Sequence, residues 1–285
     1  MFGRRVKGDD GSIRSKGMGM RVLLGWALLG VAFGHGSPVL AADALPYEAS
    51  TSALIAAYPD FLASRQGNDL VWTDGTKMPI DDGKGDKPFE TMLNAPDIKD
   101  QFSQAYAIGK PGAAPDVNQD PGRIRYDALF RKMYGDCRKG GVAKDMEPVA
   151  WLPKHKGGKV MFSIINGAAK ALQDVSDELD ALPAAVTKFL IPSAGSFNCR
   201  VIAGTDRASM HSYGVAIDIN TAHAHYWRNA KPDGKGRLTY HNEIPFEIVD
   251  IFERHGFIWG GKWYHYDTMH FEYRPEFMPQ PKPSQ

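Results

Sequence analysis

The sequence has little cysteine, almost no net charge and no apolar run of membrane-spanning length. Its 285 residues include two cysteines, and 34 lysines and arginines are balanced by 33 aspartates and glutamates, for a formal net charge of +1. That balance gives no electrostatic argument for nucleic acid or an anionic membrane as a partner, and we expect neither. The length and the hydrophobic fraction of 43% are typical of a globular chain with its own core.

The N-terminus has the pattern of a secretory signal peptide. Residues 22–33 form an apolar run after Arg21, and small residues follow at Ala41 and Ala42. A basic segment, a short apolar segment and small residues at a cleavage site are typical of export signals, and the run is short for a transmembrane helix. We therefore predict a signal peptide over residues 1–42, and a mature protein in the periplasm or outside the cell without stable membrane insertion. An uncleaved membrane anchor is the alternative.

Export changes what the two cysteines imply. In an oxidising compartment an even number of cysteines favours a disulfide, here between Cys137 and Cys199. The bond would close a loop of about 60 residues and stabilise the fold by ~3–4 kcal/mol in the chain-entropy model. Two unpaired buried thiols are the alternative.

The pattern of apolar residues favours an α+β fold. We expect three segments to be helices: 47–58, 161–182 and 245–255. Three short runs have the pattern of strands: 215–219, 257–259 and 269–273. This mixture predicts a small antiparallel sheet flanked by helices, with an N-terminal extension.

The chain divides into four parts on this interpretation. The signal peptide is followed by residues 43–130, an N-terminal extension whose role the sequence does not indicate. Residues 131–278 form the domain that carries the motifs described next, and residues 279–285 form a C-terminal tail. Residues 81–86 resemble a calcium loop only superficially, because the bidentate glutamate of an EF-hand is missing, so we predict a solvated turn there.

Two short stretches concentrate the side chains that a hydrolytic metal site requires. They are Ser-Met-His-Ser-Tyr-Gly-Val-Ala-Ile-Asp at 209–218 and Asp-Thr-Met-His-Phe-Glu at 267–272. If the first stretch ends in a strand, its branched residues enter the core and Asp218 faces the other way, where a carboxylate needs a partner such as a cation. His211 lies just before this strand. In the second stretch His270 lies on the face opposite the apolar residues and can reach the same ion.

Other polar residues in or near these motifs are candidates for proton transfer, for hydrogen bonding to an imidazole or for metal binding. Asp267 is expected in the turn before the second histidine, where it could take a proton from water without being a ligand. Glu272 is expected to accept a hydrogen bond from an imidazole. His265 is the rival metal ligand, while His223 and His225 are either surface residues or an adventitious metal pair.

The double pattern Ser-x-His-x-x-Gly-x-Ala-x-Asp and carboxylate-x-x-His resembles that of the M15 zinc peptidases, over about residues 190–275. This family includes D-alanyl-D-alanine carboxypeptidases and L-alanyl-D-glutamate endopeptidases. The resemblance implies that residues 131–278 are a small α+β zinc peptidase domain with one catalytic Zn²⁺ ion and peptidoglycan stem peptides as substrates. The metal ligands that it carries over are His211, Asp218 and His270, and the catalytic base is Asp267.

The resemblance also implies an arginine that polarises the scissile carbonyl and a serine that contacts the substrate. For this arginine we choose Arg200, with Arg207 as its competitor. The tyrosine-arginine-proline stretch found upstream in some members, which would identify the arginine, is absent here. Ser209 matches the serine, with local turn hydrogen bonding as its alternative role. The tryptophan-containing stretch at 256–263 and the aspartate at 267 favour the L-alanyl-D-glutamate endopeptidase branch. The rival interpretations are a D-alanyl-D-alanine carboxypeptidase and a non-catalytic cell-wall module that binds zinc or peptide.

Overall fold

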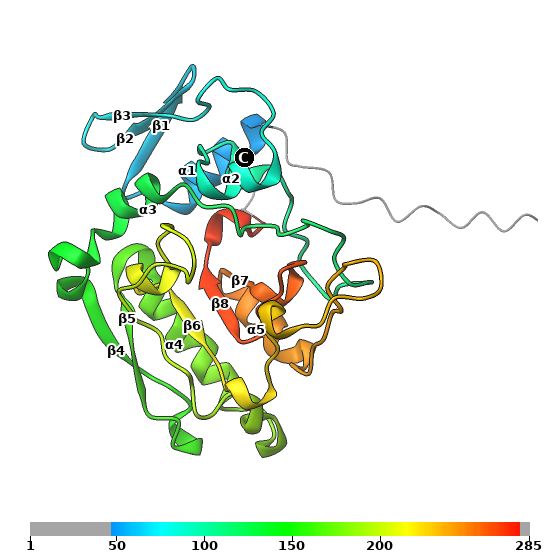
Figure 1. Cartoon of the computed structure of the whole chain (residues 1–285). Coiled ribbons are helices and arrows are strands. Elements are labelled where there is room, and N and C mark those ends of the chain that lie inside the picture. The colour runs from blue at the N-terminus through cyan, green and yellow to red at the C-terminus, as the bar shows by residue number, and fades with distance from the viewer. Residues whose placement is uncertain (1–46, 280–285) are drawn as a thin grey trace, which may run out of the picture. The chain divides into compact units, whose positions relative to one another are not determined.

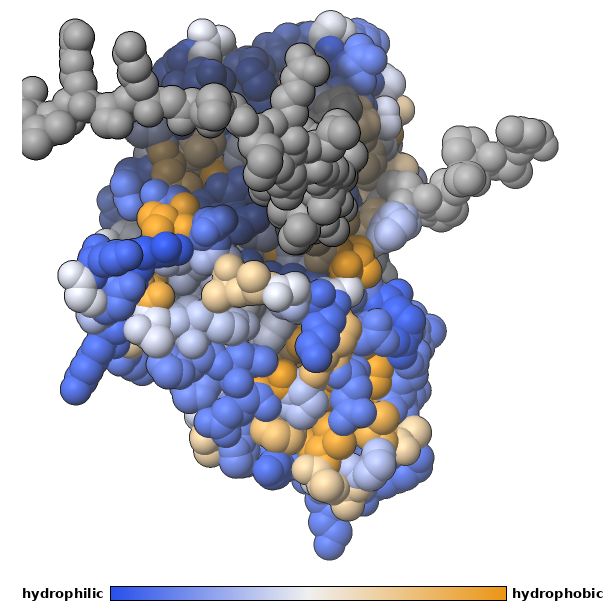
Figure 2. All heavy atoms as spheres, turned by 90° about the vertical axis from the view of Figure 1, so that its right-hand side faces the viewer, coloured by the Kyte–Doolittle hydropathy of each residue, from blue (hydrophilic) through white to orange (hydrophobic). Residues whose placement is uncertain are grey.

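The computed structural model describes residues 47–279, which lie within one compact unit. The predicted signal peptide (1–42) and all but the first residue of the predicted tail (279–285) lie outside the described residues. Among the described helices, none has both the length and the apolarity of a membrane span. Figure 2 shows one face of the molecule, which is mainly hydrophilic, with apolar residues gathered toward the lower right of the view.

The N-terminal part of the described chain holds three helices and a small antiparallel sheet (Figure 1). The helices are α1 (Tyr47–Ala57), α2 (Phe89–Asn94) and α3 (Asp127–Tyr134). The sheet has the order β1-β2-β3, with β1 (Leu62–Gln66), β2 (Asp69–Trp72) and β3 (Lys77–Pro79). The predicted helix at 47–58 is therefore confirmed; it ends just before Pro59, which cannot continue a helix. The β1–β2 turn uses Gly67, whose φ is +62°, a conformation that glycine adopts without strain.

The C-terminal part holds two further antiparallel sheets and two helices. The strands are β4 (Met146–Ala150), β5 (Lys159–Ser163), β6 (Ala216–Asp218), β7 (Phe257–Trp259) and β8 (His270–Tyr273). The helices are α4 (Ala168–Leu179) and α5 (Phe246–Arg254). β4 pairs with β5, and the other sheet has the order β6-β8-β7. α4 packs against β4, β5 and α5, and α5 packs against β7, so these helices cover apolar sheet faces as an α+β fold requires.

The sequence-based prediction placed the start of α4 too early in the chain. We expected a helix over 161–182, but residues 159–163 form β5 and the helix begins only at Ala168. In β5 the buried residues Val160 and Phe162 alternate with exposed ones, which is the period of a strand. Gly167 then takes a left-handed conformation, with φ +72°. The predicted α+β fold with antiparallel strands and flanking helices is confirmed, with three small sheets within residues 47–279 where we expected one.

The N-terminal extension packs directly on the C-terminal segment. The Tyr58 hydroxyl donates a hydrogen bond of 2.6 Å to Glu276, and the Tyr106 hydroxyl donates one of 2.6 Å to Glu253. The boundary predicted between residues 130 and 131 falls inside α3, and the division into an extension and a peptidase domain stays a prediction.

The predicted disulfide between Cys137 and Cys199 is confirmed, with a Cα–Cα distance of 5.7 Å.

Candidate metal centre and active-site cleft

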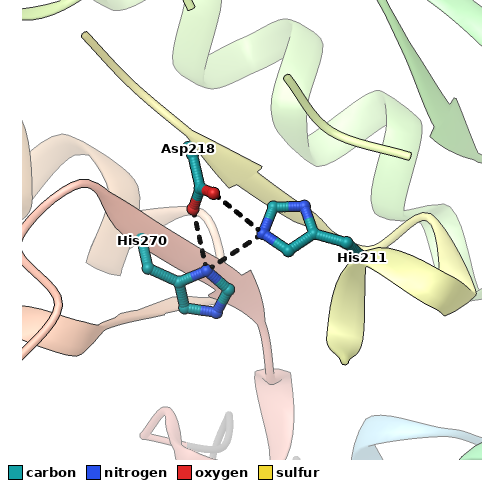
Figure 3. A group of neighbouring side chains, drawn as sticks. All are labelled: His211, Asp218 and His270. Atoms are coloured by element: carbon teal, nitrogen blue, oxygen red, sulfur yellow. Dashed lines mark hydrogen bonds and ion pairs between the residues drawn. The ribbon is translucent and has the colours of Figure 1, made fainter. Parts of the chain in front are cut away.

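Three side chains from distant parts of the sequence converge on one point. The Nε2 atom of His211 lies 3.2 Å from Nδ1 of His270 and 3.2 Å from a carboxylate oxygen of Asp218. Nδ1 of His270 lies 3.0 Å from the other oxygen of Asp218. Figure 3 shows the three side chains pointing toward one another from a short turn, β6 and β8. The two motifs identified in the sequence therefore meet in space.

Local backbone geometry brings the three residues together. β6 and β8 are antiparallel neighbours in which Asp218 is paired directly with His270, so both side chains lie on the same sheet face. His211 sits in the 3₁₀ turn Met210–Tyr213, which ends at Gly214 in a left-handed conformation with φ +68°. The Nδ1 atom of His211 lies 2.5 Å from the carbonyl oxygen of Ser196. That contact fixes the ring so that Nε2 is left to face the other two residues.

A buried chain of ion pairs holds His270 from its other side. Nε2 of His270 donates to Glu272 at 3.0 Å, and the predicted role of Glu272 as an imidazole acceptor is thereby confirmed. Glu272, with no exposed surface, also accepts from Arg125 at 2.5 and 3.0 Å and from Arg274 at 2.9 Å. Arg274 also donates a hydrogen bond of 2.5 Å from Nε to the carboxylate of Glu276. The orientation of one imidazole is thus set by charges that come from the N-terminal extension as well as from β8 and the segment after it.

The electrostatics of the group favour positive charge at its centre. Burial disfavours the charged form of His270, but its hydrogen bonds with Asp218 and Glu272 outweigh burial and raise its pKa to about 10. Burial likewise opposes ionisation of Asp218, yet the hydrogen bonds from His211 and His270 hold the pKa of this carboxyl well below its usual range. Carboxylates that stay charged in a buried site require a cation close by.

The donor set fits a zinc ion. The two imidazole nitrogens and one carboxylate oxygen all lie within 4.8 Å of one another. Zn²⁺ takes nitrogen ligands at about 2.0–2.1 Å and carboxylate oxygens at about 2.0–2.2 Å in a tetrahedron, and catalytic zinc sites use three protein ligands with one open position. These residues therefore form a group that could hold one metal ion.

Asp267 lies beside this group with an unused oxygen. It precedes β8, and its Oδ1 atom is buried without a hydrogen-bond partner among the described residues. Burial raises the pKa of Asp267 to about 6, with the charge of His270 opposing and that of Asp218 adding to the increase. A carboxylate whose pKa lies near neutrality is suited to accept and return a proton.

A cavity of about 500 Å³ opens over the group. Arg200 and Ser209 line it together with the converging side chains and Asp267, whereas Arg207 lines a neighbouring cavity instead. Trp263 also lines this cleft and donates from its indole nitrogen to the Pro121 carbonyl at 2.8 Å. The side chains predicted to react with or bind a substrate therefore share one space with the metal group.

The rival histidines lie outside the group. His265 is held 2.6 Å from Asp120, and it lines the cleft without joining the converging donors. His223 and His225 lie 3.6 and 3.0 Å from the exposed Glu243. Within the described residues, the metal group consists of the three motif side chains alone.

Sequence reasoning missed the residues that support the site from outside the motifs. The carbonyl of Ser196 contacts His211, and Arg125 contacts Glu272, which in turn holds His270; both come from segments with no recognisable pattern. One signal was present: Glu272 was expected in a strand, and a buried carboxylate needs cationic partners. Nothing in the sequence says which of the 34 lysines and arginines supplies them.

Comparison with known proteins gives one match. Residues 203–273 match the model of an M15 peptidase family described as D-alanyl-D-alanine carboxypeptidase. Among curated proteins and among solved structures, nothing matches the chain. The matched segment contains Asp267 and the three converging side chains, and it begins after Arg200. The resemblance to M15 peptidases expected from the motifs is thus confirmed over this segment of the chain.

Proposed function

We propose that this protein is an exported zinc metallopeptidase that hydrolyses peptide bonds in peptidoglycan stem peptides, most like an L-alanyl-D-glutamate endopeptidase. One observation carries the proposal. Two imidazole nitrogens and a carboxylate converge within 4.8 Å of one another, beside a carboxylate with a buried, unpartnered oxygen, in a segment that matches a peptidase family.

Metal binding and proton transfer are assigned to different residues of the site. Nε2 of His211, the carboxylate of Asp218 and Nδ1 of His270 would hold one zinc ion. When bound, zinc supplies a Lewis acid and makes water nucleophilic near neutral pH. Asp267 takes the proton of the attacking water and returns it to the leaving amine, a role that its pKa of about 6 suits.

Two further residues act on the substrate. Arg200 is exposed and lines the cleft, so its guanidinium can turn toward the scissile carbonyl and stabilise the charge that develops on its oxygen. Ser209 is buried at the cleft wall and positions the peptide. Fixed donors aimed at a developing oxyanion contribute several kcal/mol, about 2.7–4 for one such donor.

Export is supported by the covalent structure. The Cys137–Cys199 disulfide is the kind of bond that persists in oxidising compartments and is rare in the cytosol of mesophiles. Together with the expected signal peptide over residues 1–42, it favours the periplasm or the cell exterior, where peptidoglycan is found.

The test is digestion of purified peptidoglycan, with the products identified by mass. We expect release of peptide products that stops with a chelator and returns with added zinc. Asp267→Asn should retain zinc but lose hydrolysis, while Asp116→Asn, at an exposed aspartate, should behave as the unsubstituted protein. Full activity of Asp267→Asn would refute the assigned base, and zinc-independent hydrolysis would refute the metal role.

The description of the matched family favours a second candidate, a D-alanyl-D-alanine carboxypeptidase. The two differ in product: a carboxypeptidase removes one terminal alanine, whereas an endopeptidase releases the stem beyond its first alanine. Muropeptide masses separate them directly. A non-catalytic module that binds zinc or peptide would bind without producing either mass change.

A further inference from the structure

A second, larger cavity adjoins the metal cleft. It has a volume of about 710 Å³ and shares Arg123, Arg125, Trp227 and His265 with the cleft. Residues 90–96 and the start of α3 form one wall, and residues 202–208 form another. The N-terminal extension, which lies wholly outside the matched peptidase segment, therefore completes a space that opens beside the metal group.

Arginines dominate the charge of this cavity. Two of them already have carboxylate partners: Arg125 is paired with Glu272, and Arg123 lies 2.8 Å from Asp120. Arg228 also lines the cavity; it donates to the carbonyl of Ala203 at 2.7 Å, and no described carboxylate forms an ion pair with it. The cavity thus contains more arginine charge than its nearest acids neutralise.

Arg207 has the least compensation. It is half-buried, its Nε atom is buried without a hydrogen-bond partner, and no described carboxylate lies within 4.0 Å of its guanidinium. Burial, followed by the charges of Arg123 and Arg125, lowers the pKa of Arg207 to about 10. A partly buried cation among other cations is unfavourable unless an anion joins it.

The acids that line the cavity do not fill this need. Asp127 is engaged by Arg131 and by the Tyr213 hydroxyl. Glu90 and Asp206 are both exposed to solvent, and neither forms an ion pair with a described residue. The charge of Glu90 acts on Arg207 and opposes the lowering of its pKa, but no described acid pairs with the guanidinium, which is therefore open to an anion from outside the chain.

We propose that Arg123, Arg207 and Arg228, here called the arginine subsite, bind a free carboxylate of the peptide whose scissile bond lies at the metal group. This inference rests on the proposed function and specifies its substrate class: an acidic peptide with a carboxylate close to the cleaved bond. The planar guanidinium matches a carboxylate with two parallel hydrogen bonds, which lysine cannot do. The proposal also gives the two candidate arginines different roles: Arg207 binds the substrate carboxylate, and Arg200, in the cleft, stabilises the charge on the scissile carbonyl oxygen.

A γ-linked glutamyl residue provides such a carboxylate. When glutamate is joined to the next residue through its side chain, its α-carboxylate stays free one residue beyond an alanyl-glutamyl bond. The probe is L-alanyl-γ-D-glutamyl-L-lysine, compared with the same tripeptide in which only that α-carboxylate is amidated. The pair differs by one charge and keeps its shape.

The experiment compares Arg207→Gln with the unsubstituted protein and with Arg237→Gln, a control at an exposed arginine outside both cavities. We expect Arg207→Gln to lower kcat/KM for the acidic tripeptide by about 10- to 100-fold, the effect of losing a charge-assisted hydrogen bond. It should leave cleavage of the amidated tripeptide nearly unchanged, and Arg237→Gln should affect neither. Equal losses on both peptides, or no loss on either, would overturn the subsite.

A binding measurement separates this inference from the proposed function. Calorimetric titration of each tripeptide into the chelator-treated protein requires no hydrolysis, and Arg207→Gln should weaken binding of the acidic tripeptide alone by the same factor. Binding discrimination without any hydrolysis would refute the peptidase but not the subsite. Hydrolysis without discrimination would refute the subsite but not the peptidase. Arg207→Gln should unfold no more easily than the unsubstituted protein, because the substitution removes a poorly compensated charge.

Discussion

Substitution of Glu272 by glutamine tests how the metal group is held. Glu272 has no exposed surface and accepts the Nε2 hydrogen bond of His270 at 3.0 Å. It also accepts from Arg125 and Arg274. In the unsubstituted protein the carboxylate orients the imidazole and increases its basicity as a ligand. Glutamine keeps the shape but loses the charge, so both effects weaken.

The magnitude follows from two contributions. Partners that orient a ligating histidine contribute about 10- to 100-fold to metal affinity, which corresponds to ~1.4–2.8 kcal/mol. Removing one member of a buried ion pair costs about 3–5 kcal/mol of folding stability. We therefore expect Glu272→Gln to bind zinc about 10- to 100-fold more weakly in competition with a chromophoric chelator, and to unfold at lower urea concentration.

Glu276→Gln is the matched control. Glu276 is equally buried and accepts from Arg274 at 2.5 Å and from Tyr58 at 2.6 Å, but it does not contact His270. This variant should lose similar stability and keep the zinc affinity of the unsubstituted protein. If Glu272→Gln bound zinc as tightly as Glu276→Gln, the reasoning about ligand support would be wrong.

Three more predictions concern stability and are measured by urea unfolding. Burial opposes ionisation of Asp120, but its hydrogen bond with His265 and the charge of Arg123 outweigh burial and lower its pKa. Asp120→Asn should therefore lower the free energy of unfolding by about 3 kcal/mol at pH 7. This difference from the unsubstituted protein should vanish as the pH falls through the lowered pKa. A difference that persisted at the lowest pH would contradict this. Gly214→Ala should cost about 1–2 kcal/mol, because φ is +68° there; an unchanged midpoint would refute it. Reducing the Cys137–Cys199 bond, which closes a sequence separation of 62 residues, should cost about 4 kcal/mol, and a much smaller loss would point to residual structure in the unfolded chain.

The sequence predicts the metal group well because its signals are local. Strand alternation placed Asp218 and His270 on polar faces, and the observed register pairs these two residues directly. The glycine of the first motif, Gly214, has a φ of +68°, so this motif residue also specifies the turn before β6. Patterns that depend on neighbours along the chain can be read without the fold.

What the sequence could not predict depends on contacts across the chain. The sequence pattern assigns residues 161–163, the end of β5, to the following helix because a short apolar run suits both periods. Arg125 reaches Glu272 across 147 positions of sequence, and no local pattern specifies such a pairing. The same limit explains why the arginine-lined cavity, built partly from residues 90–96, was not anticipated.

The most direct test of the metal centre is the zinc content of the purified, dialysed protein, measured by inductively coupled plasma mass spectrometry. We expect one zinc ion per chain in the unsubstituted protein and in His223→Ala, whose imidazole faces Glu243 outside the group. We expect none in His211→Ala. A full zinc complement in His211→Ala, or its loss in His223→Ala alone, would contradict the account.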